Sequence, residues 1–169
     1  MNEIEVKILE QSHKKLESRL KIIGAKKVFE GELYAIFYKL KNKNEILRLR
    51  KEGNKNYLTH KGNFKKGEVK SADETEIEVS DFEITKTLID KLGYKKIKSS
   101  RKNRISYKLD NIKFEFDKLL GEESFVPEFL EIESNNISDL YKGVELLGFN
   151  KKDCTNYGGK EIIAHYLQK

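Results

Sequence analysis

An α+β fold built on one antiparallel sheet is predicted by three features of the sequence. Strand-like runs mostly follow one another through short turns, whereas a parallel sheet would need a crossover between them. Gly53-Asn54 and Asp110-Asn111 each separate two such runs, as the turns of hairpins do. Seven segments carry charged residues at alternate positions with apolar residues between them, which is typical of strands with two unlike faces.

Eight strands and four helices are expected along the chain. The strands are predicted at residues 2–9, 29–40, 45–51, 56–61, 73–79, 104–109, 112–119 and 128–134. The helices are predicted at residues 12–23, 82–92, 137–147 and 159–168, and the first three end at Gly24, Gly93 and Gly148. The stretch Gly62–Ser71 is expected to be a long mobile connection within a hairpin. No linker or repeat divides residues 1–169, so one domain is expected.

The composition favours an anionic partner and argues against several classes of protein. Charged residues make up 37% of the chain and the net charge is +6, which favours nucleic acid, a nucleotide or a polyphosphate as partner. Cys154 is the only cysteine and the three histidines are scattered, so neither a disulfide framework nor a zinc enzyme is expected. No apolar run approaches the ~18 residues of a membrane span. A strand that starts at residue 2 or 3 leaves no room for a signal peptide, and we expect a cytoplasmic protein.

The opening segment shows what the charged faces could do. Glu3, Glu5 and Lys7 share one side of the first strand, opposite Ile4 and Val6. Two carboxylates ~7 Å apart, followed by an ammonium, could hold a divalent cation beside an anion. The charged faces of the later strands hold Arg48, Arg50, Lys61, Glu74, Glu76, Glu78, Lys102, Arg104, Glu115, Asp117, Glu131 and Glu133.

The spacing alone leaves two arrangements of these faces open. In one, a flat sheet turns its charged side to water and its apolar side to the helices. In the other, the sheet closes into a barrel with its charged side inward, and about eight strands leave room for side chains or one small ligand. Buried charges are costly unless they match one another, metal ions or an anionic ligand. A barrel of this kind would therefore suit a metal–triphosphate complex.

Six parts of the sequence, taken in order, resemble the CYTH superfamily, or triphosphate tunnel metalloenzymes. The matching segments are Glu3-x-Glu5-x-Lys7, Leu47-Arg48-Leu49-Arg50, Lys61, Glu74-Thr75-Glu76-Ile77-Glu78, Lys102-Asn103-Arg104, and Asp117 followed by Phe129-Leu130-Glu131-Ile132-Glu133. The superfamily includes class IV adenylate cyclases, thiamine triphosphatases, inorganic triphosphatases and fungal RNA triphosphatases. The resemblance covers nearly the whole chain.

The resemblance implies a closed antiparallel barrel of eight strands, with helices packed outside and a triphosphate bound in the tunnel. The phosphate-binding residues that it implies are Lys7, Arg48, Arg50, Lys61, Lys102 and Arg104. The implied ligands of Mg²⁺ or Mn²⁺ are Glu3, Glu5, Asp117, Glu131 and Glu133, with Glu74, Glu76 and Glu78 as supporting acids. The chemistry agrees, because arginine binds phosphate oxygens and hard cations take oxygen ligands.

The second predicted strand departs from the cyclase-like members of the superfamily. Their second strand carries Q-x-D-x-Y-F, where this chain has Glu32-Leu33-Tyr34-Ala35-Ile36-Phe37. Tyr34 takes the aspartate position, and certain bacterial triphosphatases have tyrosine there. By this similarity Tyr34 and Lys7 would activate the attacking water, with the pKa of Lys7 lowered by metals and nearby cations. The alternative is that Tyr34 only packs against the barrel wall.

A triphosphatase is therefore the predicted function, with inorganic triphosphate, thiamine triphosphate or a nucleoside triphosphate as its substrate. The alternative within the superfamily is a class IV adenylate cyclase, which makes cyclic AMP and pyrophosphate from ATP. A third hypothesis is a non-catalytic barrel that binds nucleotides or RNA, but the aromatic residues lie mostly opposite the charges, which argues against nucleic acid. No membrane partner is expected, and apolar outer surface left uncovered by helices would favour a homodimer.

Overall fold

The chain folds around a barrel of β-strands. The computed structural model describes residues 2–40 and 44–168. The strands in these residues are β1 (Asn2–Ile8), β2 (Lys26–Lys39), β3 (Ile46–Glu52), β4 (Lys55–Lys66), β5 (Lys70–Val79), β6 (Lys95–Leu109), β7 (Ile112–Leu119) and β8 (Phe129–Ser134). The α-helices are α1 (His13–Ile22), α2 (Phe82–Lys91), α3 (Ile137–Leu146) and α4 (Gly159–Leu167). Short 3-10 helices lie at Gly121–Glu123 and Lys151–Asp153.

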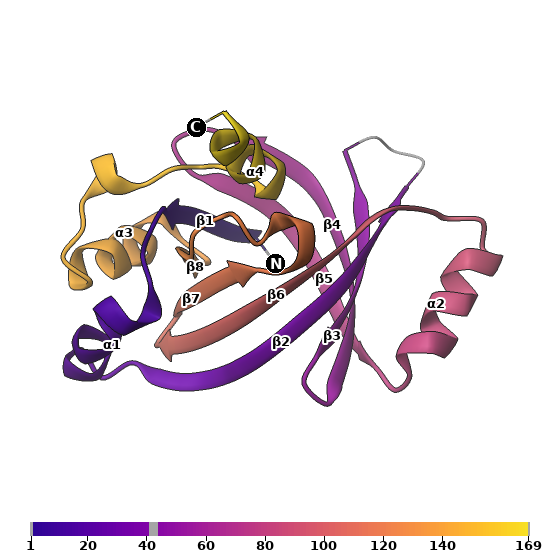
Figure 1. Cartoon of the computed structure of the whole chain (residues 1–169), viewed down its shortest axis with the longest axis horizontal. Coiled ribbons are helices and arrows are strands. Elements are labelled where there is room, and N and C mark those ends of the chain that lie inside the picture. The colour runs from indigo at the N-terminus through magenta and orange to yellow at the C-terminus, as the bar shows by residue number, and fades with distance from the viewer. Residues whose placement is uncertain (1, 41–43, 169) are drawn as a thin grey trace.

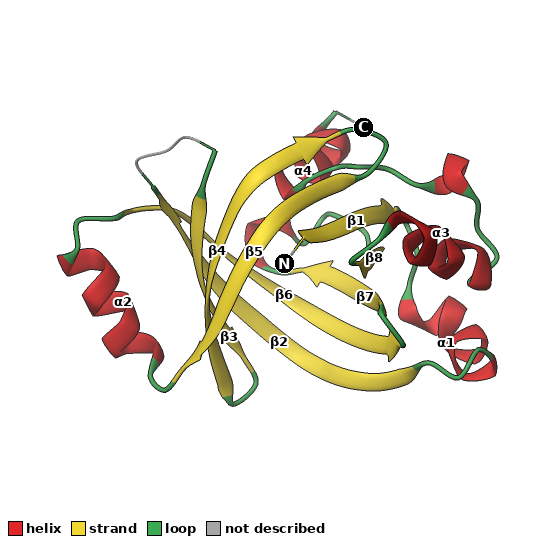
Figure 2. Cartoon of the chain, turned by 180° about the vertical axis from the view of Figure 1, so that it is seen from behind, coloured by secondary structure: helices red, strands yellow, loops and turns green. Residues whose placement is uncertain are grey.

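The strands close into a barrel in the order β1-β5-β4-β3-β2-β6-β7-β8, with β8 paired to β1 (Figure 1). Every neighbouring pair is antiparallel. The long strands β2 and β6 run side by side through the wall, as Figure 2 shows. The predicted closed barrel of eight antiparallel strands is confirmed, and the flat sheet is wrong.

The helices pack outside the barrel on apolar side chains. The largest cluster joins α1 and α3 to the outer face of β1, β7 and β8, and its members Leu20, Phe114 and Leu140 are fully buried. At the other end of the molecule α2 covers β2 and β3 through Phe82 and Ile89. Apolar burial of this kind is the main stabilising contribution to such a fold. Among the described residues, no helix is long and apolar enough to cross a membrane.

A separate apolar cluster lies at the barrel end where β7 finishes and β8 begins. Leu119 and Phe129 point inward there, because their cross-strand partners Lys102 and Asp117 face the interior. Ile162 of α4 packs with them and is fully buried. Burying a side chain of this size contributes about 1.5–3 kcal/mol. Helix α4 therefore closes this end of the barrel.

Three predicted boundaries are wrong, and strand pairing explains each of them. The predicted connection Gly62–Ser71 is mostly strand, since β4 continues to Lys66 and β5 starts at Lys70, with a shift in register after Gly62. Strand β6 starts at Lys95 rather than at residue 104, and β2 starts at Lys26 rather than at residue 29. These segments are rich in lysine, which has low strand propensity, but they pair with neighbouring strands, and the β2–β6 pairing shifts in register after Lys27 and after Phe37.

Candidate active site

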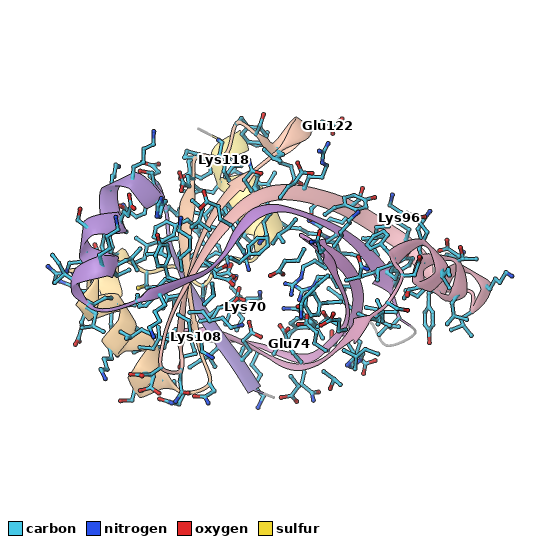
Figure 3. The ribbon with its side chains drawn as sticks, turned by 90° about the horizontal axis from the view of Figure 1, so that it is seen from below. Lys70, Glu74, Lys96, Lys108, Lys118 and Glu122 are labelled. Atoms are coloured by element: carbon cyan, nitrogen blue, oxygen red, sulfur yellow. The ribbon has the colours of Figure 1, made fainter. Side chains whose placement is uncertain are left out.

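The charged alternate positions of the strands point into the barrel. Arg48 lies opposite Thr59, and Thr59 lies opposite Glu76, so one face continues from β3 through β4 to β5. The apolar alternate positions, such as Leu49 and Phe114, are fully buried on the outer side beneath the helices. Figure 3 looks into the barrel and shows the polar side chains that line its wall. The interior is therefore a charged site built mostly from the strand residues that the sequence pattern singled out.

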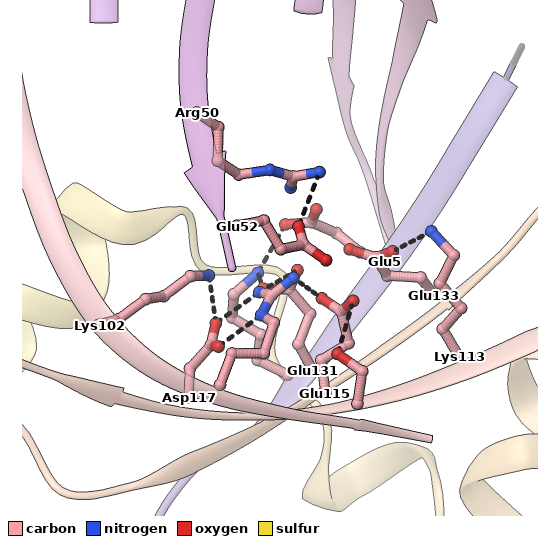
Figure 4. A network of polar contacts seen from close by, with 12 residues as sticks. Glu5, Arg50, Glu52, Lys102, Lys113, Glu115, Asp117, Glu131 and Glu133 are labelled. Carbon is pink, nitrogen blue, oxygen red and sulfur yellow. Dashed lines mark hydrogen bonds and ion pairs between the residues drawn. The ribbon is translucent and has the colours of Figure 1, made fainter. Parts of the chain in front are cut away.

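A tightly paired network occupies the centre of the interior (Figure 4). Arg104 donates to Asp117 twice, with 2.6 Å from Nε to Oδ1 and 2.6 Å from Nη2 to Oδ2, and it also pairs with Glu115. Lys102 donates to Asp117 Oδ2 over 2.5 Å. Asp117 is only 1% exposed, and although burial raises its pKa, the charges of Arg104 and Lys102 lower the pKa overall. These two cations donate to both oxygens of the Asp117 carboxylate.

Lys7 lies between two carboxylates of neighbouring strands. Its Nζ is 2.6 Å from Glu5 Oε1 and 2.6 Å from Glu131 Oε2. Burial alone would lower the pKa of Lys7, but the charges of Glu131 and Glu5 outweigh burial and raise it. The expected lowering of the Lys7 pKa depends on bound metal ions and nearby cations, and it stays a prediction. Burial and the neighbouring charge of Arg104 instead lower the pKa of Lys102 to about 8, despite its contact with Asp117.

The arginines of β3 form the basic part of the site. Arg48 and Arg50 both contact Glu76, at 3.3 and 3.4 Å, and Arg50 also lies 3.2 Å from Glu52. Burial, and next the charge of Arg50, lower the pKa of Arg48. Among the described residues, the buried Nε groups of Arg48 and Arg50 have no hydrogen-bond acceptor. Since a buried N–H without an acceptor costs free energy, these donors fit an anionic ligand.

Carboxylates gather in two groups that share Glu133. Oxygens of Glu3, Glu5 and Glu133 lie within 4.8 Å of one another, and so do oxygens of Glu115, Glu131 and Glu133. Burial first, and then the charges of Glu3 and Glu131, raise the pKa of Glu133 well above its ordinary value. The possible metal ligands are therefore carboxylate oxygens whose negative charge the neighbouring cations do not fully neutralise. Such a set of ligands fits a hard divalent cation.

A cavity of about 10 Å³ opens beside the group formed by Glu3, Glu5 and Glu133. It is lined by Glu3, Glu5, Lys61 and Glu74, with Lys70 and Phe64 nearby in its wall. A space of this size accommodates about one water molecule or ion. Lys61 is paired with Glu74, and Lys70 Nζ donates to Glu5 Oε1 over 2.8 Å. Basic and acidic groups thus meet at this opening.

The three acidic residues predicted on strand β5 differ in how deeply they lie in the barrel. Glu74 and Glu76 face the interior and contact the arginines of β3, whereas Glu78 is 54% exposed on its side chain and pairs with Lys55 at 2.9 Å. Glu78 is therefore the most exposed of the three residues, and the barrel does not enclose its side chain.

Tyr34 does not face the interior. It lies opposite Lys51 on β3 and Arg101 on β6, whereas the next residue, Ala35, lies opposite the inward Arg50. The Tyr34 ring packs against Phe82 of α2, with 5.7 Å between ring centroids. The predicted pairing of Tyr34 with Lys7 is wrong, and the alternative of packing on the outer wall is confirmed. The physical reason is strand alternation, which places Tyr34 on the same side as the buried Ile36.

Sequence reasoning missed several charged groups of the interior. Glu52 continues the alternation of Arg48 and Arg50 and could have been found from spacing, whereas Glu115 was placed on the charged face of Asp117 without a role in the site. Lys70 and Lys98 lie in segments that were not predicted as strands, and no signal in the sequence marked them. Lys98 Nζ lies 5.3 Å from the ring centroid of Phe37, which faces the interior opposite Arg48.

Comparisons with known proteins show which proteins this chain resembles in sequence and in structure. The chain is 31% identical over 145 residues to a protein of Methanocaldococcus jannaschii that is provisionally named an adenylate cyclase, and the match covers 83% of this chain and 80% of that protein. A solved structure from Pyrococcus horikoshii is 27% identical with a TM-score of 0.78, covering 95% of this chain and 98% of that one.

A plant protein from Hippeastrum has the same fold at lower identity. It is 16% identical with a TM-score of 0.62, and the match covers 97% of this chain and 95% of that one. Its description names it provisionally as an adenylyl cyclase and reports a dominant triphosphatase activity. Residues 1–149 of the present chain match the CYTH domain, and the chain therefore belongs to the CYTH family.

Proposed function

We propose that this protein is a divalent-metal-dependent triphosphatase that releases phosphate from a triphosphate bound inside the barrel. The observation that carries the proposal is the pair of buried Nε donors on Arg48 and Arg50, which lack acceptors among the described residues and share the interior with crowded carboxylates. A triphosphate would accept from these donors. The proposed phosphate-binding residues are Lys7, Arg48, Arg50, Lys61, Lys102 and Arg104.

The carboxylate groups are the proposed holders of Mg²⁺ or Mn²⁺. Glu3, Glu5, Glu131 and Glu133 belong to the two groups of neighbouring oxygens, so they fit this role directly. Asp117 is fully paired with Arg104 and Lys102, and we assign to it the orientation of those two cations instead. A bound divalent ion would neutralise charge that develops on the phosphate oxygens.

Proton transfer is the role that we propose for Lys102. Its pKa of about 8 brings it closer to losing its proton near neutral pH than Lys7, whose pKa is raised by Glu131 and Glu5. A group whose pKa lies near the working pH is an effective general base. Lys7 stays charged under the same conditions, which suits it to holding phosphate oxygens between Glu5 and Glu131.

What is known of the family supports an enzyme that acts on triphosphates. CYTH proteins include both triphosphatases and adenylate cyclases, so the family alone does not choose between them. The Hippeastrum protein carries a cyclase name together with a dominant triphosphatase activity. A cyclase name on a relative is therefore compatible with hydrolysis in this chain.

An adenylate cyclase is the second candidate, and one feature of the barrel favours it. Strand β2 turns the uncharged residues Leu33, Ala35 and Phe37 to the interior, between the arginines of β3 and the lysines of β6. Phe37 is half-buried, and its ring could stack on the base of ATP. The 31% identity to the provisionally named cyclase of Methanocaldococcus jannaschii points the same way.

A panel of triphosphates with separated products distinguishes the two candidates. With Mg²⁺ or Mn²⁺ we expect inorganic phosphate from inorganic, thiamine or nucleoside triphosphate, and no turnover in excess chelator.

Glu5→Gln should lower kcat by about 100-fold or more because a ligand charge is lost. Glu78→Gln, the same change on a 54% exposed side chain, serves as control and should retain activity. Pyrophosphate and cyclic AMP as the main products from ATP would show that the protein is a cyclase rather than a triphosphatase. Full activity with chelator would contradict the metal requirement.

A further inference from the structure

Helix α2 carries an apolar stripe that its packing on the barrel does not use. Ile84, Leu88 and Leu92 recur at every fourth position, and their exposed fractions are 71, 56 and 65%. Residues four apart are neighbours on a helix surface. Other side chains, Phe82 and Ile89, hold the helix on the barrel and are buried. In Figures 1 and 2, α2 stands apart from the other helices at one end of the molecule. Grouped exposed apolar residues of this kind mark an interaction surface.

We propose that a second copy of this chain covers the stripe, with the two α2 helices packed antiparallel about a two-fold axis at Leu88. Ile84 and Leu92 are equally spaced on either side of Leu88. An antiparallel pair therefore places Ile84 against the partner's Leu92, and Leu88 against the partner's Leu88. This contact is isologous, because both copies bury the same patch.

The charges at the ends of α2 fit the antiparallel orientation. Asp81 and Glu83 lie at its N-terminal end, and Lys91 and Lys95 lie at or just after its C-terminal end. Antiparallel packing brings each acidic end beside the partner's basic end, whereas parallel packing would bring like charges together. The opposed helix dipoles add to this preference. These features favour a second copy over an unrelated partner.

The size of the surface sets the strength of the dimer. One face of a ten-residue helix is small compared with the ~800 Å² per partner of a standard stable interface. The dimer therefore forms in a concentration-dependent manner rather than as an obligate assembly. It involves none of the interior residues, so the proposal stands or falls independently of the enzymatic activity.

Light scattering over a concentration series from about 10 μM to about 1 mM tests the proposal. We expect the mass of the parent protein to rise from 19.8 kDa toward twice that value. Leu88→Glu should remain monomeric throughout, because it places two like charges against each other on the axis. Ile22→Glu is the matched control, since Ile22 on α1 is 80% exposed and lies outside the stripe, and this variant should dimerise like the parent.

Cross-linking tests the orientation of the pair. In a Cys154→Ser background, Leu88→Cys should form a disulfide-linked dimer on oxidation, because a residue on the two-fold axis meets its own copy. Ile22→Cys in the same background should not. Circular dichroism verifies that each variant is folded. A parent that stays monomeric at every concentration, a dimeric Leu88→Glu variant, or equal cross-linking through residues 88 and 22 would each overturn the proposal.

Discussion

Among single residues, the interior arginines differ in how fully their donors are used. Arg104 places Nε and both Nη groups on carboxylates of Asp117 and Glu115. Arg48 and Arg50 leave a buried Nε without an acceptor among the described residues. An unsatisfied buried donor costs about 1–3 kcal/mol, which a phosphate oxygen would recover on binding. The arginines of β3 are therefore prepared for a ligand, whereas Arg104 holds the carboxylates in place.

Replacing Arg48 by lysine tests this distinction, because lysine keeps the charge and removes the Nε donor. We expect KM to rise about tenfold or more for every triphosphate alike, since a charge-assisted hydrogen bond contributes about 1.5–3 kcal/mol. Arg101→Lys is the control, as Arg101 is an exposed arginine on the outer face that pairs with Glu32. Steady-state kinetics on two triphosphates measure the effect. An increase of KM for one triphosphate and not for the other would show that Arg48 contacts the organic part of the substrate.

At the scale of elements, the C-terminal segment completes the barrel wall. Strand β1 pairs with β5 only from Asn2 to Glu5, and at Lys7 the partner changes to Thr155. Lys7 N donates to Thr155 O, and Thr155 N donates to Lys7 O, both over 2.8 Å. Asn156 donates from its side chain to Gly67 O over 2.6 Å, which ties the same segment to the β4–β5 hairpin. This segment lies beyond the residues that match the CYTH domain.

Thr155→Pro removes the N–H that Lys7 O accepts, and it should displace the Lys7 side chain from between its two carboxylates. We expect kcat/KM to fall about tenfold, together with a loss of about 1 kcal/mol of stability for the lost hydrogen bond. Thr155→Val keeps the backbone donor and the side-chain shape, so it should remain close to the parent in kinetics. Equal activity of the proline and valine variants would mean that the bridge does not position Lys7.

The elements also show where prediction from sequence succeeds and where it stops. Alternation predicted the inward faces of β1, β3, β7 and β8 because short strands with two unlike faces carry a clear pattern. Lys70 and Lys98 were missed because their stretches are polar on both faces, and only pairing with a neighbouring strand makes them part of the wall. Tyr34 was placed inside by similarity of position, although its spacing from Phe37 already assigned the two to opposite faces.

Across the whole molecule, the barrel interior contains charge that the folded protein alone does not balance. Glu131 has a pKa well below its ordinary value because, against burial, Lys7 and Arg104 stabilise its charge. Glu133 has the opposite shift, from burial and from the charges of Glu3 and Glu131. A raised pKa in the folded state means that stability is complete below the unfolded pKa and is lost as pH rises toward the folded value. Ionised Glu133 is thus a cost to stability that a bound cation would remove.

Glu133→Gln should therefore stabilise the metal-free protein at pH 8 while it impairs the enzyme. We expect its Tm in chelator to exceed that of the parent by several degrees, because ~1 kcal/mol corresponds to ~2–4 °C in a domain of this size. The difference should shrink as the pH falls toward the ordinary pKa of a glutamate, because the raised pKa of Glu133 favours its protonated form in the folded parent. Added Mg²⁺ or Mn²⁺ should raise the Tm of the parent more than that of the variant. Glu78→Gln, on an exposed side chain, should show neither effect. A lower Tm for Glu133→Gln at pH 8 without metal would mean that the Lys113 contact at 3.4 Å already compensates this carboxylate, and the crowded group would then be no more than a balanced internal network.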